Sequence, residues 1–367
     1  MTPLPITVLT GFLGSGKTTL LSKLLRRPEL ADTAVVINEF GEVGLDHLLV
    51  AKASENIVEM SDGCLCCTVR GDLVETLADL VERREAGSIR PFRRVVIETT
   101  GLADPAPIIH TLMTDPALTA AYRLDGIVTV VDAVNGPATL DAHQEAVKQA
   151  AVADRLVVSK RDLPQADAGL EGRLRRLNPA APIVDAAAAA EDPSLILNAG
   201  LFEPGRKHPD VAGWLRAEAY ADDRHGHDHS HCDHEHGHCE HDHGHDHHHG
   251  DANRHDDHIR AFCVTRDQPI SGVGFTLLLQ MLSANVGEKM LRVKGILNIA
   301  GKSERPAVIH GVQHIFHPVA WLDAWPDDDR RSRIVFITRD IPRDSIEKLL
   351  DVLDARGHEA ERVSAAQ

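Results

Sequence analysis

Three cysteines fall within four residues of one another, at Cys64, Cys66 and Cys67. Thiolates are strong ligands for Zn²⁺ and for other borderline or soft ions, and three of them on one loop can converge on a single ion. Neighbours this close in the chain are poorly placed to form disulfides with each other, because a disulfide needs a particular Cα separation and orientation. The motif therefore predicts a metal site. A buried thiol cluster and a redox pair are the alternatives.

A phosphate-binding loop (P-loop) lies upstream of these cysteines. Residues 11–18 fit the pattern G-x-x-x-x-G-K-[ST], directly after an apolar strand and at the start of a helix. Glycines let the backbone wrap a phosphate, the backbone N–H groups supply positive potential, and the lysine reaches the terminal phosphates. A Gly-rich turn with a chance lysine is the alternative, which this context disfavours. The motif predicts nucleotide contacts from Gly11, Gly14, Ser15, Gly16 and Lys17, with Thr18 as a ligand of Mg²⁺.

An acidic strand end lies downstream of the cysteines. Glu98 closes the apolar run of residues 95–97, and Thr-Thr-Gly follows it. An acid in this place can hold Mg²⁺ through water, and the N–H group of Gly101 can contact a γ-phosphate. Taken alone, the segment is equally well explained as a common strand-end acid and turn. After a phosphate-binding loop, the functional interpretation is favoured.

A second strand end carries a base-recognition pattern. Ser159-Lys160-Arg161-Asp162 stands where nucleotide-binding domains specific for guanine carry Asn-Lys-x-Asp. Asp162 can accept two hydrogen bonds from the guanine N1–H and exocyclic amine, which adenine does not offer, and Lys160 can lie over the base. A charged loop at a strand end is the alternative. The position of the segment in the order of elements favours guanine.

These motifs need a sheet whose strand ends meet at one edge. Near-continuous apolar strands alternate with helical patterns up to about residue 202, which indicates an α/β fold with a mostly parallel sheet covered by helices on both faces. The expected strands are Ile6–Leu9, Ala34–Asn38, Ile57–Glu59, Arg94–Glu98, Gly126–Asp132, Leu156–Ser159 and Ile183–Val184. The expected helices are Gly16–Arg26, Thr68–Arg84, Ala106–Met113, Ala138–Val152 and Leu170–Arg176.

The last hundred residues follow another pattern. A strand is expected at Ile259–Arg266 and a helix at Gly272–Asn285, and a helix at Arg343–Arg356 closes the segment. Between the two helices the expected strands are Met290–Ile299, Ala307–His310, Ile315–Pro318 and Arg333–Thr338. This order indicates a smaller α+β domain with a mainly antiparallel sheet. The domain limits expected from the whole chain are 1–204, 205–258 and 259–357.

A histidine-rich tract separates the two patterns. Fifteen of the 23 histidines lie between His225 and His258, interleaved with acids and with Cys232 and Cys239. Residues 221–258 also carry −9 of the net charge of −16, so the rest of the chain has no charge pattern typical of a nucleic-acid binder. Such a composition cannot bury a core and predicts disorder. Imidazoles suit Zn, Ni, Co and Cu, so the tract is expected to collect metal with low selectivity, an inert linker being the alternative.

Together, these motifs resemble the CobW/YjiA-like family of P-loop GTPases, proposed metal chaperones and metallocofactor-insertion factors. The match is carried by residues 11–19, 38–42, 63–67, 98–101 and 159–162, with residues 292–295 and 307–318 matching the family's C-terminal domain. The resemblance covers nearly the whole chain except the histidine-rich tract. It extends the nucleotide contacts to Thr19 and places the loop with Glu39 and Glu42 beside the cysteines. One departure is Ser159, which stands in place of the usual Asn and weakens the bracing of its loop.

The position of residues 38–67 between the P-loop and Glu98 predicts a switch segment ordered by the γ-phosphate and Mg²⁺. Glu39 and Glu42 are candidates for additional Zn²⁺ ligands and for orienting the attacking water, with Glu39, Lys17 and Glu98 as the candidate catalytic residues. The sequence offers no obvious arginine finger or water-orienting Gln, so slow intrinsic hydrolysis, stimulated by metal or a client, is expected.

We therefore expect a Mg²⁺-dependent GTPase that binds GTP and Zn²⁺, with Co²⁺ or Ni²⁺ as other possible ions, and delivers the ion to a client metalloprotein. The expected protein is cytoplasmic, a monomer or homodimer, and contacts neither nucleic acid nor membrane, since no apolar run approaches a membrane span. Cobalt delivery for cobalamin synthesis and passive metal storage in the histidine-rich tract are the alternative functions. A nucleotide kinase would leave the cysteines and histidines unexplained.

Overall fold

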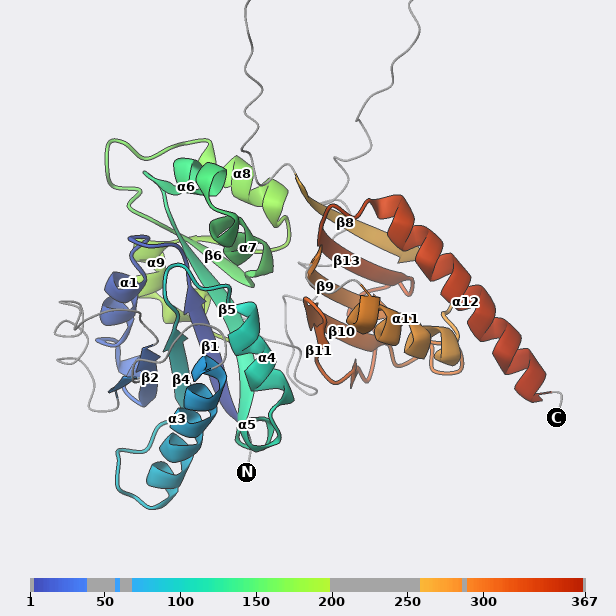
Figure 1. Ribbon diagram of the computed structural model, residues 1–367, viewed down its shortest axis with the longest axis horizontal. Helices are drawn as coiled ribbons and strands as arrows, with labels where there is room; N and C mark the ends of the chain where they lie inside the picture. The colour runs from blue at the N-terminus through green and yellow to red at the C-terminus, as the bar shows by residue number, and fades with distance from the viewer. Residues whose placement is uncertain (1–2, 38–56, 60–67, 199–257, 286–288, 366–367) are drawn as a thin grey trace, which may run out of the picture.

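The computed structural model describes residues 3–37, 57–59, 68–198, 258–285 and 289–365. Two sheets with their own helices make up this part of the chain (Figure 1). The first is a seven-stranded sheet in which every pairing is parallel, and the second is a six-stranded antiparallel sheet. The predicted α/β fold with a smaller α+β C-terminal domain is therefore confirmed.

The parallel sheet has the strand order β3-β2-β4-β1-β5-β6-β7. Its strands are β1 (Leu4–Thr10), β2 (Thr33–Ile37), β3 (Ile57–Glu59), β4 (Arg94–Glu98), β5 (Tyr122–Asp132), β6 (Arg155–Ser159) and β7 (Ile183–Asp185). The apolar runs are buried on both faces because side chains alternate along a strand. In β4, Val95 and Ile97 join one apolar cluster and Val96 joins the cluster on the opposite face.

Helices cover both faces of this sheet. They are α1 (Lys17–Leu24), α3 (Thr68–Glu85), α4 (Ala106–Thr114), α5 (Pro116–Ala121), α6 (Gly136–Ala142), α7 (Gln144–Val152), α8 (Leu170–Leu177) and α9 (Ala186–Glu191). Helices α1 and α9 pack on one face, and α3, α4, α5, α7 and α8 pack on the other. Since the strands are parallel, the loops after β1, β4, β5 and β6 meet at one edge.

Three helical details differ from the prediction. The single helix expected over 138–152 is two helices, because His143 adopts an extended conformation with φ −131° and ψ 114° and separates α6 from α7. Helices α5 and α9 were not predicted. Each begins after an aspartate, Asp115 or Asp185, whose side chain accepts hydrogen bonds from the first backbone N–H groups of the helix. An Asp N-cap is the signal that could have revealed them.

The antiparallel sheet has the order β11-β10-β9-β13-β8, and β12 pairs with β10. Its elements are β8 (Ile259–Arg266), α11 (Gly272–Asn285), β9 (Met290–Leu297), β10 (Ala307–Val312), β11 (Ile315–Phe316), β12 (Ala320–Trp321), β13 (Ser332–Arg339) and α12 (Arg343–Ala365). Helices α11 and α12 pack on one face of this sheet. The short strand β12 was not predicted, and α12 continues nine residues beyond the predicted end at Arg356.

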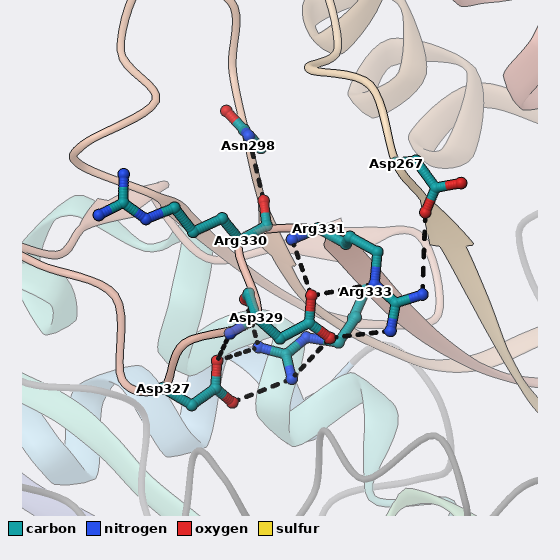
Figure 2. Close-up of polar contacts among 7 residues, drawn as sticks. All are labelled: Asp267, Asn298, Asp327, Asp329, Arg330, Arg331 and Arg333. Atoms are coloured by element: carbon teal, nitrogen blue, oxygen red, sulfur yellow. Dashed lines mark hydrogen bonds and ion pairs between the residues drawn. The ribbon is translucent and has the colours of Figure 1, made fainter.

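Arginine–aspartate pairs fix the connection between β12 and β13 (Figure 2). Asp327 accepts two hydrogen bonds, of 3.0 and 2.9 Å, from the guanidinium of the buried Arg333. Asp329 accepts two from Arg331, both at 3.0 Å, and Arg331 also lies 3.7 Å from Asp267. Paired contacts of this kind hold both partners in one orientation. They stabilise the C-terminal sheet and involve no residue predicted to bind nucleotide or metal.

The two sheets are joined by a buried charge cluster. Asp154, which precedes β6, accepts hydrogen bonds from Arg292 and, at 2.7 Å, from Lys294 on β9. Arg292 also donates to the backbone oxygen of Val152 at 2.7 Å. Burial alone would raise the pKa of Asp154, but the two cations hold it well below its usual range. Asp154 is therefore the counter-ion for two cations of the C-terminal domain.

Two histidines beside this cluster make stability depend on pH. Burial and the nearby charge of Arg292 lower the pKa of His317 to about 3, and the same causes hold the pKa of His310 well below its ordinary value. A buried neutral histidine stabilises the fold fully above its unfolded pKa of about 6.5, and that stability is lost as the pH falls toward the folded pKa. We expect about 1–2 kcal/mol to be lost per histidine between pH 7.5 and pH 5.

Urea unfolding at both pH values measures this loss. The His310→Gln/His317→Gln protein should lose much less stability between the two pH values than the wild type, whereas His314→Gln, at an exposed position, should behave like the wild type. Equal losses in all three proteins would contradict the assignment.

Candidate nucleotide and metal site

The loop after β1 has the backbone that its glycines predict. Gly11, Gly14 and Gly16 have φ values of 140°, 69° and 95°, a region that residues with a Cβ rarely adopt. At Gly11 a Cβ would also lie 2.2 Å from the backbone oxygen of Val130. Substitution there would displace the loop from β5. The sequence therefore folds this loop into the shape that surrounds a phosphate.

Lys17 begins α1 and turns its side chain back into the loop. Its Nζ donates hydrogen bonds to the backbone oxygens of Gly11 at 2.8 Å and Phe12 at 3.3 Å, and the residue is 8% exposed. A cation held inside the loop is placed to meet an anion that the loop surrounds. Ser15 is buried in the same loop, and Thr19 lies in the first turn of α1. The predicted phosphate contacts thus come from one short segment.

The two predicted Mg²⁺ residues meet although they are eighty positions apart. Thr18 Oγ1 donates a hydrogen bond of 2.6 Å to Glu98 Oε1, at the end of the buried strand β4. A hydroxyl and a carboxylate are oxygen donors of the kind that Mg²⁺ prefers. The pair therefore fits a Mg²⁺ ion beside the phosphate loop.

The turn after β4 packs directly on the P-loop. Thr99 Oγ1 donates to Thr10 Oγ1 at 2.8 Å, and a Cβ on Gly101 would lie 2.5 Å from the backbone nitrogen of Leu13. The fully buried Gln149 of α7 donates from Nε2 to the backbone oxygens of Gly101 at 3.3 Å and Ala103 at 2.9 Å. Gly101 is therefore held against the loop, as a role in phosphate recognition requires.

The segment predicted to recognise the base also contacts the P-loop. Ser159 Oγ donates to the backbone oxygen of Ser15 at 2.6 Å, so the serine braces the two loops despite replacing Asn. Lys160 Nζ donates to the backbone oxygen of Gly14 at 2.8 Å and to Asp132 Oδ2 at 2.6 Å. Asp162 lies exposed in the following turn.

Asp132 is the residue of this site that sequence reasoning missed. Burial alone would raise its pKa, but hydrogen bonds from Lys160, Asn135 and two backbone N–H groups lower it. The carboxylate therefore stays ionised and keeps its charge beside Lys160. An acid ending a buried strand, as Glu98 does, was the signal that could have found it.

The predicted Zn²⁺ ligands lie outside the described residues. This applies to Cys64, Cys66, Cys67, Glu39 and Glu42, and to the histidine-rich tract. In the described part of the chain, no three His, Cys, Asp or Glu side chains are grouped so that they could hold a metal ion. The cysteine motif belongs to the connection between β3 and α3, both of which are described.

Cys263, on β8, differs from a metal ligand. It is 5% exposed, and burial raises the pKa of its thiol to about 11. Metals bind the thiolate, so a buried thiol with a raised pKa is poorly suited as a ligand, and Cys263 is best explained as a packing residue. As for membranes, none of the described helices combines the length and apolar composition that a bilayer crossing requires.

Comparison with known proteins divides the chain into the same two parts as its two sheets do. Residues 5–185 match the family model described as CobW/HypB/UreG, nucleotide-binding domain. Residues 259–353 match the model described as Cobalamin synthesis protein cobW C-terminal domain. The two models coincide with the parallel and the antiparallel sheet, respectively.

Individual relatives match nearly the whole chain or less than half of it. Zinc chaperone YjiA of Escherichia coli K12 is 31% identical over 346 residues, covering 94% of this chain and 97% of the relative. Zinc-regulated GTPase metalloprotein activator 1 of Schizosaccharomyces pombe is 39% identical over 173 residues, covering 45% of this chain and 41% of the relative. The crystal structure of Zn(II)-bound YjiA GTPase from E. coli is 28% identical, covers 96% of this chain and 99% of that one, and superposes with a TM-score of 0.67. The chain therefore belongs to the CobW family of P-loop GTPases.

Proposed function

We propose that the protein is a GTP-hydrolysing metallochaperone that binds Zn²⁺ at Cys64, Cys66 and Cys67 and delivers it to a client protein under the control of GTP. A relative that matches 94% of the chain is named a zinc chaperone, and one that matches 45% of it is named a zinc-regulated GTPase metalloprotein activator. The observation that carries the proposal is the contact between Thr18 and Glu98 beside the P-loop. The cysteines lie in the connection between β3, a strand of the parallel sheet, and α3, a helix that packs on that sheet.

The described residues supply positioning and charge for phosphoryl transfer. In the proposed reaction Lys17 neutralises the terminal phosphates, and the N–H of Gly101 faces the γ-phosphate. Thr18 and Glu98 would hold Mg²⁺, which would supply charge stabilisation for the phosphate oxygens. Lys160 and Asp162 bind the guanine base. Hydrolysis without a partner is expected to be slow, since the sequence lacks an obvious arginine finger.

A path of contacts supports control of the C-terminal domain by the nucleotide. The turn with Gly101 is held by Gln149 and continues to Asp104. Asp104 Oδ2 accepts hydrogen bonds of 3.3 Å from Lys148 and from Gln313, which lies in the turn after β10. We propose that movement of the Gly101 turn on hydrolysis reaches the C-terminal domain through Asp104 and Gln313, and that this domain contacts the client.

Zinc binding and GTP binding are then thermodynamically linked. If GTP orders the segment 38–67, it raises the affinity of the cysteines for Zn²⁺, and Zn²⁺ must raise the affinity for GTP by the same factor. A coupling free energy of about 1–3 kcal/mol corresponds to a factor of roughly 5 to 150. Hydrolysis would loosen the site and release the ion to the client.

Measuring Zn²⁺ affinity with a non-hydrolysable GTP analogue and with GDP tests this function. We expect the wild type to bind Zn²⁺ more tightly with the analogue than with GDP. In Cys66→Ala, we expect weaker Zn²⁺ binding and no difference between the two nucleotides. Cys263→Ala is the matched control, because it removes a buried thiol without touching the motif. Equal Zn²⁺ affinity in both nucleotide states would contradict the proposed control. Wild-type Zn²⁺ affinity in Cys66→Ala would contradict the proposed cysteine ligands.

Cobalt delivery is the second candidate, because the C-terminal family model is described as a cobalamin synthesis protein. Titrating GTP hydrolysis with Zn²⁺, Co²⁺ and Ni²⁺ separates the two functions. We expect Zn²⁺ to stimulate hydrolysis at the lowest free concentration. Stimulation by Co²⁺ at a lower free concentration would favour the cobalt function instead.

A further inference from the structure

Two adjacent strand ends bring an unassigned acid to the nucleotide site. Asp132 ends β5, and its partner in the parallel register is Ser159, which ends β6. Lys160 follows Ser159 and adopts φ 58°, a left-handed conformation that is uncommon for a residue with a side chain. The register therefore sets the lysine next to the Asp132 carboxylate.

The Asp132 carboxylate is fully occupied by donors. Oδ1 accepts hydrogen bonds from the backbone N–H groups of Val134 at 2.7 Å and Asn135 at 3.3 Å. Oδ2 accepts from Asn135 Nδ2 at 2.9 Å and from Lys160 Nζ at 2.6 Å. The residue is 6% exposed, so water competes little for these oxygens. Its orientation is fixed by its own turn and leaves one lone pair for Lys160.

The lysine ammonium bridges this carboxylate and the P-loop. Its second acceptor is the backbone oxygen of Gly14, at 2.8 Å. A cation shared between a fixed carboxylate and a carbonyl has little freedom to rotate, and charge-assisted hydrogen bonds are the strong ones. Ser159 makes a parallel contact to Ser15. The segment that faces the base and the loop that faces the phosphates are thereby joined.

We propose that Asp132 is a positioning residue for nucleotide binding: it holds the Lys160 ammonium on the Gly14 carbonyl, so that the base site and the phosphate site form one preorganised unit. This inference rests on the proposed assignment of nucleotide binding to the P-loop and to Lys160. Asp132 acts through Lys160 and does not contact the nucleotide. Preorganisation lowers the ordering cost of binding, so losing it weakens the binding of any nucleotide.

A purely structural role for Asp132 is the competing explanation. The same carboxylate holds the turn that leads into α6, and that role would exist without any ligand. The two roles differ in their dependence on Lys160. A positioning role disappears when the lysine ammonium is absent, and a structural role does not.

A double-mutant cycle on Asp132 and Lys160 separates them. Asp132→Asn removes the negative charge and replaces one acceptor oxygen with an NH₂ donor. Lys160→Met keeps the aliphatic chain without the ammonium. We expect Asp132→Asn to raise the dissociation constant for GDP by about tenfold in the wild-type background. In the Lys160→Met background, it should change that constant by less than about twofold. Asn135→Ala, which removes another donor to the same oxygen, is the matched control and should stay within about twofold.

Inosine diphosphate provides the second measurement, because it lacks the exocyclic amine of guanine. The ratio of GDP to inosine diphosphate affinity should be unchanged in Asp132→Asn and should fall toward one in Asp162→Ala. An equal effect of Asp132→Asn in both Lys160 backgrounds would overturn the positioning role, and so would a loss of the affinity ratio in Asp132→Asn. Failure of the wild type to bind GDP would instead overturn the proposed nucleotide site.

Discussion

Replacing Lys17 with alanine is expected to lower GTP hydrolysis at least about 100-fold while the protein stays folded. Nζ of Lys17 is the cation held inside the P-loop, 2.8 Å from the backbone oxygen of Gly11. Preorganised charges at a phosphoryl-transfer site contribute about 10²- to 10³-fold or more to the rate, because they meet developing charge without reorganisation. Alanine leaves the backbone of the loop unchanged, because the loop shape is set by its glycines. Phosphate release at saturating GTP and Mg²⁺ measures the effect.

Lys23→Ala is the control for this prediction. Lys23 is exposed on the same helix α1, so its removal changes the net charge equally without touching the loop. We expect the control to hydrolyse GTP like the wild type. Hydrolysis by Lys17→Ala within tenfold of the wild type would contradict the assigned site. Zinc transfer to a chelator that is equally fast in Lys17→Ala and wild type would favour passive storage over a GTP-controlled chaperone.

The second large effect is expected at the contact between the two sheets. Asp154→Ala should lower the free energy of unfolding by about 3–5 kcal/mol, because it leaves the charges of Arg292 and Lys294 buried without their counter-ion. Asp154 Oδ2 also accepts the backbone N–H of Ile127 at 3.0 Å, so the substitution leaves this buried donor unsatisfied as well. Urea unfolding followed by far-ultraviolet circular dichroism measures the loss.

Asp323→Ala provides the matched control for this charge pair. Asp323 pairs with Arg305 at 3.1 Å, but both side chains are more than half exposed. Exposed pairs contribute at most about 1 kcal/mol. A loss in Asp154→Ala no larger than in Asp323→Ala would show that the buried cluster does not stabilise the contact. Restored stability in Asp154→Leu/Arg292→Met/Lys294→Met would identify the unpaired charges as the cause of the loss.

The fold was largely predictable because its strands are apolar on both faces and alternate with helices. Every predicted strand and helix has a counterpart among the described elements; β3, β4, β8 and α11 have the predicted ends, and the ends of the others are shifted. The break at His143 was not predictable from the apolar periodicity, which continues across it. Likewise, β12 was not predictable, because its two residues are too few to show a periodic pattern.

The candidate nucleotide site was predictable where its chemistry is contiguous in the chain. Positive φ at Gly11, Gly14 and Gly16 and the placement of Lys17 follow from the types and spacing of neighbouring residues. The meeting of Thr18 with Glu98 followed from two strands that end at the same edge. The roles of Cys64, Cys66 and Cys67 remain predictions of the sequence alone.

The sequence by itself determined the family, the phosphate-binding loop and the chemistry of its candidate ligands, because these properties belong to short segments whose local geometry their residues dictate. Only the tertiary structure decided which distant residues cooperate. The longest step in the link from Asp132 through Lys160 to Gly14 joins positions 146 residues apart, and the link from Asp154 to Arg292 joins positions 138 residues apart. Such contacts depend on strand order, register and the docking of the two sheets. A pattern of residue types along the chain does not specify them.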